Sequence, residues 1–570
     1  MKISRRSPVS LVIMGGATLS FVLIFLLSPL SIIFLQSLWS APLGRGGSFT
    51  FQWYPIILAN EFLHGVIGNT LIIAAGTVLL SMMIGVGLAF IVNRTDIPHG
   101  SILENILIMP LFIPTLTLAM AFSLFLSPVG YLPTLVRHVW PTFHFSLYEH
   151  PYVFIPVLVS VRLSVYVFLL ASAALKLMDP SLEESARVAG SGVLRTALKV
   201  SLPVIRPSLI FALILVLIQS VEQFAIPMLI GQPKQIYVLT TFLYWLENRA
   251  TFTVEGDAFR YGTLGATAFT IIGFLMILAF AQRRFLGKTQ RFRTVSGKAT
   301  KSRPVRIGRF RYVAFALCML YVVLTTVVPI VVTFYTSMVK QWNPSANQFE
   351  LFTLGNWIYL LNDPASFRAI TNTLLVSTSG AILGIALASA ASYVIYRTEL
   401  FGRRTLDLVT WIPSMVPGVI MGLGFLWFWL RFPLPVYGTA LSLVITFVIR
   451  HMSFAVRNTS SALLTLNPEL EESSRICGAS FLKTFTRITI PLIRTGLLGA
   501  WILLFVTFFS EFTTAVLLYS PESVVISTLM YDWWDVGFYP MIATIAFLQF
   551  AIIAGCLLVM NRLGVGFARF

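Results

Sequence analysis

Apolar runs long enough to cross a lipid bilayer recur along the whole sequence. The hydrocarbon core of a bilayer is about 30 Å thick, so a spanning helix needs about 20 apolar residues. Charged residues make up only 11% of the 570 residues, against about 25% in soluble domains. Because a backbone in lipid must satisfy its own hydrogen bonds, we predict an all-α polytopic membrane protein. The twelve expected spans are residues 11–38, 66–93, 102–126, 152–176, 204–230, 262–282, 312–338, 371–396, 406–430, 437–460, 492–518 and 541–562.

The first apolar run begins directly after the basic residues MKISRR. A cleaved signal peptide also places basic residues before an apolar run. The run here is longer than the core of a signal peptide and lacks a clear small-x-small cleavage site. We therefore predict a retained first span.

The distribution of basic residues predicts which loops face the cytoplasm. If the N-terminus lies inside, the inside segments include 176–206, 450–494 and 283–311, the last of which holds eleven Lys or Arg and no acid. Both termini are then cytoplasmic. The net charge of +18 reflects this topology and contact with anionic lipid, and we expect no nucleic-acid partner. The outside loops are 39–65, 127–151, 231–261, 339–370, 431–436 and 519–540.

The chain contains an internal duplication, with six predicted spans in each copy. The segment from Asn69 matches the segment from Asn372 at an offset of 303. Beyond the outside loop at 127–151 the offset becomes 288, which aligns Arg162 with Arg450. An even number of spans returns the chain to the same side, so the two copies are parallel. We predict a first half at 1–282, a basic cytoplasmic linker at 283–311 and a second half at 312–570.

One charged segment is present in both copies. It reads LEESARVAGSGVLRTALKVSLP at 182–203 and LEESSRICGASFLKTFTRITIP at 470–491. An Asp-Pro or Asn-Pro pair before each segment is typical of a helix start. A Glu and an Arg four residues apart favour an exposed helix, and a later glycine can end that helix in a left-handed turn. We predict a helix-turn-helix on the cytoplasmic surface, with the landmarks Asp179, Pro180, Glu183, Arg187 and Gly190, and Asn467, Pro468, Glu471, Arg475 and Gly478.

Two roles are open for this surface element. An amphipathic connector can lie in the lipid headgroups. The acidic pair is repelled by anionic lipid, however, and the face formed by Leu182, Ala186, Ala189 and Val193 buries little apolar area. A face of small residues suits docking into a groove on another protein.

The spacing within both segments resembles the "EAA…G…I-LP" loop of binding-protein-dependent ABC importer permeases. The first copy has Glu184-Ser185-Ala186, Gly190 and Pro203, and the second has Glu472-Ser473-Ser474, Gly478 and Pro491. The serines depart from the alanines of the motif. The resemblance implies a type I ABC importer permease fold in which these loops dock on an ATP-binding subunit. The implied coupling residues are Glu183, Glu184, Ser185, Ala186, Gly190 and Pro203, and Glu471, Glu472, Ser473, Ser474, Gly478 and Pro491.

The fused pair of halves looks most like the ferric-iron transport permeases, and related permeases carry thiamine, polyamines or aminoethylphosphonate. A phosphate-binding loop requires G-x-x-x-x-G-K-[ST]; the tract GKT at 287–289 has Gln282 where the first glycine is needed. We therefore expect no cofactor on this chain, with ATP and Mg on a partner subunit. The resemblance implies two copies of a cytoplasmic ABC ATPase, a periplasmic solute-binding protein and a location in the bacterial inner membrane.

Ionisable residues within the predicted spans are candidates for lining or gating a pathway. They are Arg162, Glu222, Arg450 and Glu511. The alternative is that they form ion pairs between helices or extend to the membrane interface. Prolines 110, 114, 413 and 417 are expected to kink their spans. The six histidines and three cysteines show no metal-ligand spacing, so we predict no metal site.

Two further function classes fit part of the sequence. A twelve-span secondary transporter driven by an ion gradient has the same hydropathy, but it has no ATPase on which a duplicated cytoplasmic helix-turn-helix would dock. A membrane enzyme is disfavoured because the sequence shows no nucleophile–base pair and no paired catalytic carboxylates.

Overall fold

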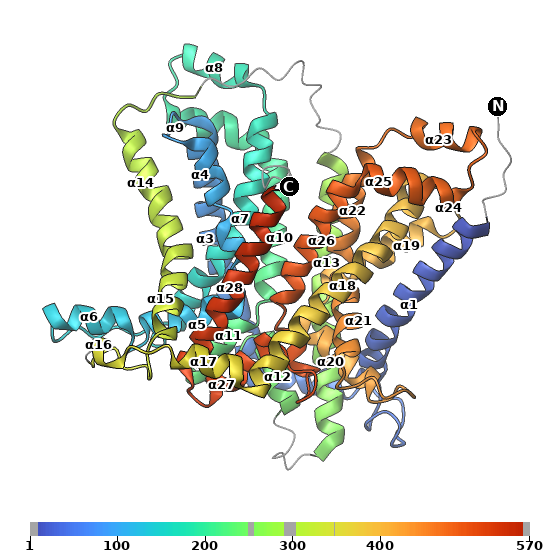
Figure 1. Cartoon of the computed structure of the whole chain (residues 1–570), viewed down its shortest axis with the longest axis horizontal. Coiled ribbons are helices and arrows are strands. Elements are labelled where there is room, and N and C mark those ends of the chain that lie inside the picture. Colours follow the sequence, from blue (N-terminus) through green and yellow to red (C-terminus); the bar gives the residue numbers. More distant parts are fainter. Residues whose placement is uncertain (1–8, 249–255, 290–303, 347, 563–570) are drawn as a thin grey trace. The chain divides into compact units, whose positions relative to one another are not determined.

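The computed structural model describes residues 9–248, 256–289, 304–346 and 348–562. Within these residues the chain is helical apart from connecting turns and three isolated β-bridges, which confirms the predicted all-α fold class. The described residues pack as two compact units (Figure 1). Unit 1 consists of Met1–Ile57, Leu243–Ile272 and Leu354–Phe570, and unit 2 consists of Leu58–Phe242 and Gly273–Thr353.

Unit 2 is built around α3 (Glu61–Arg94) and α7 (Pro151–Leu177), which pack closely together. A Cβ atom on Gly85 of α3 would lie 2.5 Å from the carbonyl oxygen of Ser164 on α7, so this approach requires glycine, as is common between membrane helices. The other helices of unit 2 are α4 (Gly100–Ile106), α5 (Thr115–Leu126), α6 (Tyr131–Val139), α8 (Pro180–Val188), α9 (Val193–Thr196), α10 (Leu202–Val221), α11 (Ala225–Gly231), α14 (Phe310–Val322), α15 (Val328–Ser337) and α16 (Gln348–Leu351).

Unit 1 is built around α18 (Pro364–Arg397), which packs on α1 (Val9–Ser37) and on α26 (Arg494–Phe509). Helices α12 (Leu239–Asn248) and α13 (Gly256–Thr289) contribute residues to both units. The other helices of unit 1 are α2 (Trp53–Ala59), α17 (Gly355–Asn362), α19 (Arg403–Trp411), α20 (Gly418–Trp429), α21 (Ala440–Arg450), α22 (Met452–Leu464), α23 (Glu469–Ile476), α24 (Phe481–Thr484), α25 (Ile490–Leu492), α27 (Ile526–Asp535) and α28 (Tyr539–Arg562).

The compact units do not follow the sequence repeat. Helix α1 comes from the first predicted half but packs on α18 and α20 of unit 1. Helix α15 comes from the second predicted half but packs on α5 of unit 2. Each unit therefore contains the first span of the other half. The predicted boundaries at 282 and 311 describe the repeat and stay a prediction.

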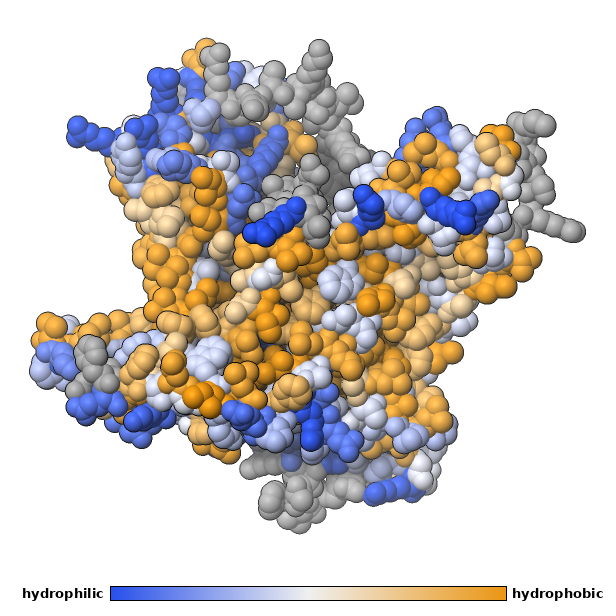
Figure 2. Space-filling model, in the orientation of Figure 1, coloured by the Kyte–Doolittle hydropathy of each residue, from blue (hydrophilic) through white to orange (hydrophobic). Residues whose placement is uncertain are grey.

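Each unit has an apolar belt between two polar ends. Figure 2 shows apolar side chains along the helices, with hydrophilic side chains gathered at either end of them. In unit 2, α8 and α9 lie at the end opposite α6 and α11 (Figure 1). In unit 1, α23 and α24 lie at the end opposite α17 and α27. This arrangement suits helices that cross a bilayer.

The described helices match the predicted number of spans, although several spans are broken. Nine helices are long and apolar enough to cross a membrane, or up to twelve if each bent pair counts as one span. The pair α19–α20 bends by 109° and the pair α21–α22 by 59°. The predicted kinks at Pro110, Pro114, Pro413 and Pro417 are confirmed, since the helices are interrupted there; proline lacks an amide hydrogen and clashes with the preceding turn.

The prediction of continuous helices is wrong for two spans, 204–230 and 492–518. Helix α10 ends at Val221, and α11 begins only at Ala225. Helix α26 ends at Phe509, two residues before Glu511. Apolar residues flank both breaks, which is why hydropathy alone predicted uninterrupted helices.

The C-terminal end of the predicted linker is fastened to α3. The Val305 N–H donates to the Arg94 carbonyl oxygen at 2.9 Å, and the Asp96 N–H donates to the Val305 carbonyl oxygen at 3.1 Å. The Asp96 carboxylate also accepts the Ile307 N–H at 2.9 Å. Residues 290–303 of the linker lie outside the described part of the chain.

Candidate functional site

The first polar segment forms a short helix followed by a left-handed turn, as predicted. Helix α8 starts at Asp179, whose carboxylate accepts the Ser181 N–H at 2.9 Å; this hydrogen bond holds the pKa of Asp179 below its usual value. Gly190 follows the helix with a φ of +83°. Helix α9 then continues through a π-helical turn, η2 (Ala197–Ser201), into α10. The prediction of a separate second helix is therefore wrong, because α9 forms the start of the next span.

The second polar segment repeats this geometry in unit 1. Asn467 accepts the Glu469 N–H at 3.1 Å at the start of α23, and Gly478 has a φ of +84°. Helix α24 leads into a second π-helical turn, η8 (Phe485–Thr489). Here the span does bend after Pro491, by 75° between the α24–α25 stretch and α26.

Glu183 does not form the exposed pair with Arg187 that the sequence spacing predicted. Its side chain is buried, and its Oε1 accepts the Arg94 Nε–H at 3.0 Å and the Ser201 hydroxyl at 2.6 Å. Arg94 is itself 3% exposed and also donates to the Leu175 carbonyl oxygen at 2.7 Å. The prediction failed because the four-residue rule describes an isolated helix, whereas this glutamate faces a cation that lies elsewhere in the sequence.

Glu471 is buried in the same way, which again contradicts the predicted exposed pair. Its Oε1 accepts the Thr489 hydroxyl at 2.7 Å, and its Oε2 accepts the Tyr393 hydroxyl at 3.1 Å. Arg475 donates to the Tyr393 hydroxyl oxygen at 2.6 Å. The Tyr393 ring lies 5.3 Å from the Phe481 ring.

Most of the other predicted coupling residues are exposed. Ala186 and Ser474 are half-buried, and Ser474 bonds Thr484 at 3.0 Å between hydroxyl oxygens. Large apolar side chains also stand exposed at equivalent positions, Val188 at 91% and Ile476 at 78%. The exposed members of the predicted coupling set are Glu184, Ser185, Gly190, Pro203, Glu472, Ser473, Gly478 and Pro491.

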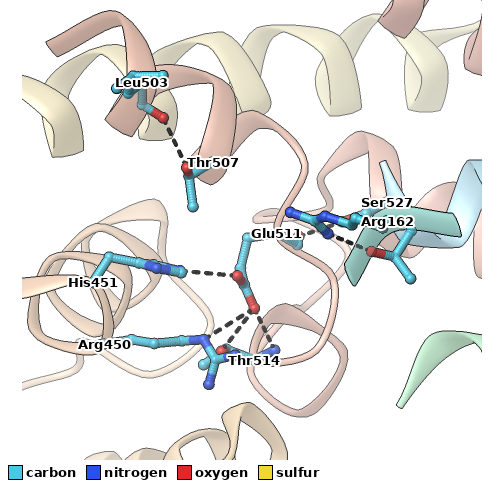
Figure 3. Close-up of polar contacts among 9 residues, drawn as sticks. Arg162, Arg450, His451, Leu503, Thr507, Glu511, Thr514 and Ser527 are labelled. Atoms are coloured by element: carbon cyan, nitrogen blue, oxygen red, sulfur yellow. Dashed lines mark hydrogen bonds and ion pairs between the residues drawn. The ribbon is translucent and has the colours of Figure 1, made fainter. Parts of the chain in front are cut away.

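Two of the four pathway candidates meet in unit 1. The Glu511 carboxylate lies 3.5 Å from Arg450 Nε and 3.0 Å from His451 Nε2 (Figure 3). It also accepts the N–H of Thr514 at 3.1 Å and its hydroxyl at 3.0 Å. His451 stands at the bend between α21 and α22, and Glu511 stands at the end of α26. The cluster therefore joins the break points of two spans.

The equivalent position in unit 2 has no such acid. Arg162 lies on α7, and its Nη1 donates to the Thr115 hydroxyl at 2.5 Å. At the offset of 288, Leu163 takes the place of His451 and Gln223 takes the place of Glu511. Glu222, the fourth candidate, is half-buried at the C-terminal end of α10. The structure thus pairs Arg450 with Glu511 and places Arg162 beside a hydroxyl.

Sequence reasoning did not select Arg94, Tyr393 or His451 as site residues. Arg94 aligns with Arg397 in the repeat, a signal that was available. Tyr393 and His451 have no charged counterpart in the first half, so the repeat offers no signal for them. Among the described residues no group of three or more His, Cys, Asp or Glu side chains is arranged to hold a metal ion.

A cavity of about 910 Å³ opens in unit 1 beside α12, α18 and α27. Its acidic lining comes from Glu247, Asp363 and Asp532. The Tyr519 hydroxyl donates to Asp532 at 2.7 Å, and burial raises the pKa values of Asp532 and Glu247 above their usual range. These residues belong to the loops predicted to face outside, so the cavity is a candidate for contact with an incoming substrate.

Comparison with known proteins finds matches along most of the chain. The model of the family described as "Binding-protein-dependent transport system inner membrane component" matches residues 81–292 and 380–564, which is more than half of the chain. The "Ferric transport system permease protein FbpB" of Actinobacillus pleuropneumoniae is 23% identical over 537 residues, covering 92% of this chain and 74% of that protein. The "Putative 2-aminoethylphosphonate transport system permease protein PhnV" of Salmonella paratyphi A is 24% identical over 238 residues, covering 41% of this chain and 86% of that protein. Among solved structures, a bacterial ABC transporter involved in alginate import matches 45% of this chain and 94% of its own chain, at 18% identity and a TM-score of 0.37.

Proposed function

The chain belongs to the family of binding-protein-dependent transport system inner membrane components, and we propose that it is the fused permease that carries ferric iron, Fe(III), across the inner membrane. As a permease of a binding-protein-dependent ABC importer, it is a multi-pass inner-membrane protein. One observation carries the proposal most directly. The same helix–glycine–helix segment occurs in each copy, with Glu184 and Glu472 exposed on it.

The partners proposed are a periplasmic solute-binding protein and two copies of a cytoplasmic ABC ATPase, one on each coupling segment. The exposed side chains Val188 and Ile476 support docking on protein, since apolar groups next to acidic ones suit a protein groove better than anionic headgroups. ATP and Mg bind to the ATPase, and both termini of this chain lie in the cytoplasm. The GKT tract at 287–289 belongs to helix α13, which is not the strand–loop–helix setting of a phosphate-binding loop.

The mechanism follows from where the segments lie. ATP-driven closure of the ATPase dimer moves α8 and α23, and each segment runs on into a membrane-spanning helix, α10 or α26. Movement of these helices opens the substrate pathway alternately to each side of the membrane. The spans broken at His451 and Glu511 supply points at which a helix can change direction.

A cross-linking experiment tests the ATPase contact. Glu184→Cys and Glu472→Cys, each in a background without Cys477, should cross-link to the ATPase in the complex that co-purifies with the tagged chain. Val139, which is 90% exposed on α6 at the other end of unit 2, supplies the control, and Val139→Cys should give no ATPase product. Absence of a product at both glutamate positions would contradict the proposal.

The substrate proposal has support from relatives named for ferric transport that match most of this chain. A relative named for 2-aminoethylphosphonate transport matches a shorter part of it, so that substrate is the second candidate; thiamine and polyamines stay less favoured, as does an ion-driven secondary transporter. Elemental analysis and mass spectrometry of the ligand that co-purifies with the cognate binding protein separate these cases. Iron in that protein, with uptake of radioactive iron that requires this chain and ATP, is the expected result; an organic ligand without iron would overturn it.

A further inference from the structure

The coupling segments are held to their own units by a buried glutamate rather than by an apolar face. All nine residues of α8 are described, and the one that is buried is Glu183. All eight residues of α23 are described, and the one that is buried is Glu471. A short surface helix normally anchors itself through apolar side chains. These two helices therefore depend on a carboxylate for their attachment.

The two carboxylates reach equivalent structural elements in the two copies. Each accepts a hydroxyl hydrogen bond from the last residue of the π-helical turn that leads into the next span, Ser201 in η2 and Thr489 in η8. Both hydroxyl residues are fully buried. π-Helical turns are rare and often occur at functional positions. Their presence at the same place in both copies indicates that this local structure has a role in each half.

The second contact of each carboxylate goes to repeat-related long helices, but through different chemistry. Glu183 meets the guanidinium of Arg94 on α3 at 3.0 Å. Glu471 meets the hydroxyl of Tyr393 on α18 at 3.1 Å. At the offset of 303, Tyr393 aligns with Phe90, one helical turn before Arg94. The connection between the coupling helix and the long helix is thus kept although the partner side chain is not.

We propose that Glu183 and Glu471 are positioning residues that tie each coupling helix to two membrane-spanning helices of its own unit, while the neighbouring Glu184 and Glu472 are left free for the partner ATPase. The role of Glu184 and Glu472 toward the ATPase rests on the proposed function, whereas the role of Glu183 and Glu471 does not. The tie transmits movement of α8 to α3 and α10, and movement of α23 to α18 and the end of η8. Without it the coupling helix moves independently of the spans.

The chain supplies a matched pair of reporter positions. Cys477 is an exposed native cysteine at the C-terminal end of α23, and its repeat equivalent at the end of α8 is Ala189, also exposed. In a background with Cys556→Ser, a nitroxide spin label on Cys477 reports on α23. A second background with Cys477→Ser and Ala189→Cys reports on α8. Electron paramagnetic resonance of the full chain in lipid nanodiscs then measures how ordered each label is.

Glu183→Gln should increase the loosened population of the label at position 189 by roughly 10- to 100-fold, the effect of losing one charge-assisted hydrogen bond. Glu471→Gln should loosen the label at 477, by less, because its partners are hydroxyls rather than a guanidinium. The controls Glu184→Gln and Glu472→Gln make the same change at exposed neighbours and should leave both labels ordered. If Glu183→Gln prevents folding, Ser201→Ala is the substitute, because it keeps the Arg94 contact. It must still loosen the label at position 189, by less than the increase expected for Glu183→Gln.

The proposed tie would be refuted if the labels stayed ordered in Glu183→Gln and Glu471→Gln. It would also be refuted if the labels loosened equally in the controls Glu184→Gln and Glu472→Gln. A second measurement separates this outcome from failure of the proposed function. In the complex that co-purifies with the tagged chain, Glu183→Gln should retain the ATPase but import several-fold less iron per ATP hydrolysed, whereas Glu184→Gln should retain less ATPase. If the unaltered chain retains no ATPase, the proposed function fails, and the label measurements still decide the tie.

Discussion

Arg162 and Arg450 occupy equivalent positions in the two copies but meet different partners. Arg162 donates to the Thr115 hydroxyl, and Arg450 lies beside the Glu511 carboxylate, with both side chains mostly buried. The position equivalent to Thr115 is Gly418, where a Cβ atom would lie 2.4 Å from Arg450 Nη1. The two halves therefore differ here: Arg162 lies beside a neutral hydroxyl, whereas the charge of Arg450 is balanced by a carboxylate.

Glu511→Gln tests the ion pair between Arg450 and Glu511. Removing one partner of a buried ion pair leaves the other charge uncompensated, so we expect the free energy of unfolding to fall by about 3 kcal/mol. The double variant Arg450→Gln with Glu511→Gln leaves no orphaned charge and should recover part of this loss. Thermal unfolding of the detergent-purified chain measures both. Strictly additive losses in the double variant would show that the pair does not interact.

Gly418→Ala tests the packing beneath Arg450. The added methyl group would displace the Arg450 guanidinium from its place beside Glu511, and overpacking of this kind costs about 1–3 kcal/mol. Gly87 is the matched control, since no atom lies within 4 Å of an added Cβ there. Gly87→Ala should stabilise by about 0.5–1 kcal/mol. Equal melting temperatures for the two variants would refute the argument.

At the scale of helices, repeat alignment predicted more than hydropathy did. The alignment placed Gly190 and Gly478 at equivalent turns, and their φ values agree within one degree. Hydropathy placed the spans but missed the breaks near Glu222 and Glu511, because apolar residues flank both. The charged residues themselves were the missed signal, since each lies where its helix ends. The burial of Glu183 was unpredictable because Arg94 lies 89 residues away.

The left-handed turn after α8 gives an element-scale prediction. Gly190→Ala places a Cβ in a region that costs an L-residue about 1–2 kcal/mol, so the turn should open and the orientation of α8 should change. Gly192→Ala is the control, because Gly192 has a φ of −67° and open space around it. Substrate-stimulated ATP hydrolysis by the co-purified complex should fall in Gly190→Ala and stay unchanged in Gly192→Ala. A fall of equal size in both would contradict the role of the turn.

At the scale of the whole molecule, the packing units and the sequence repeats are different divisions of the chain. Apolar runs carry no information about which helix packs on which, so the exchange of first spans between halves was not predictable. In unit 1, Gly424 of α20 and Gly15 of α1 both mark close contacts of α1 with second-half helices. When it is alone, the first half thus lacks the faces of α18 and α20 on which α1 packs.

Expression of the chain as two fragments, 1–296 and 297–570, tests this exchange. Alone, the first fragment exposes the face of α1 that packs on α18 and α20, and the second exposes the face of α18 that α1 covers. Each should therefore accumulate poorly and aggregate on size-exclusion chromatography. Co-expressed, the fragments should co-purify through a tag on either one and elute as one peak, because every helix then finds its own unit. A monodisperse first fragment that does not retain the second would show that the repeat, and not the exchanged unit, is what folds.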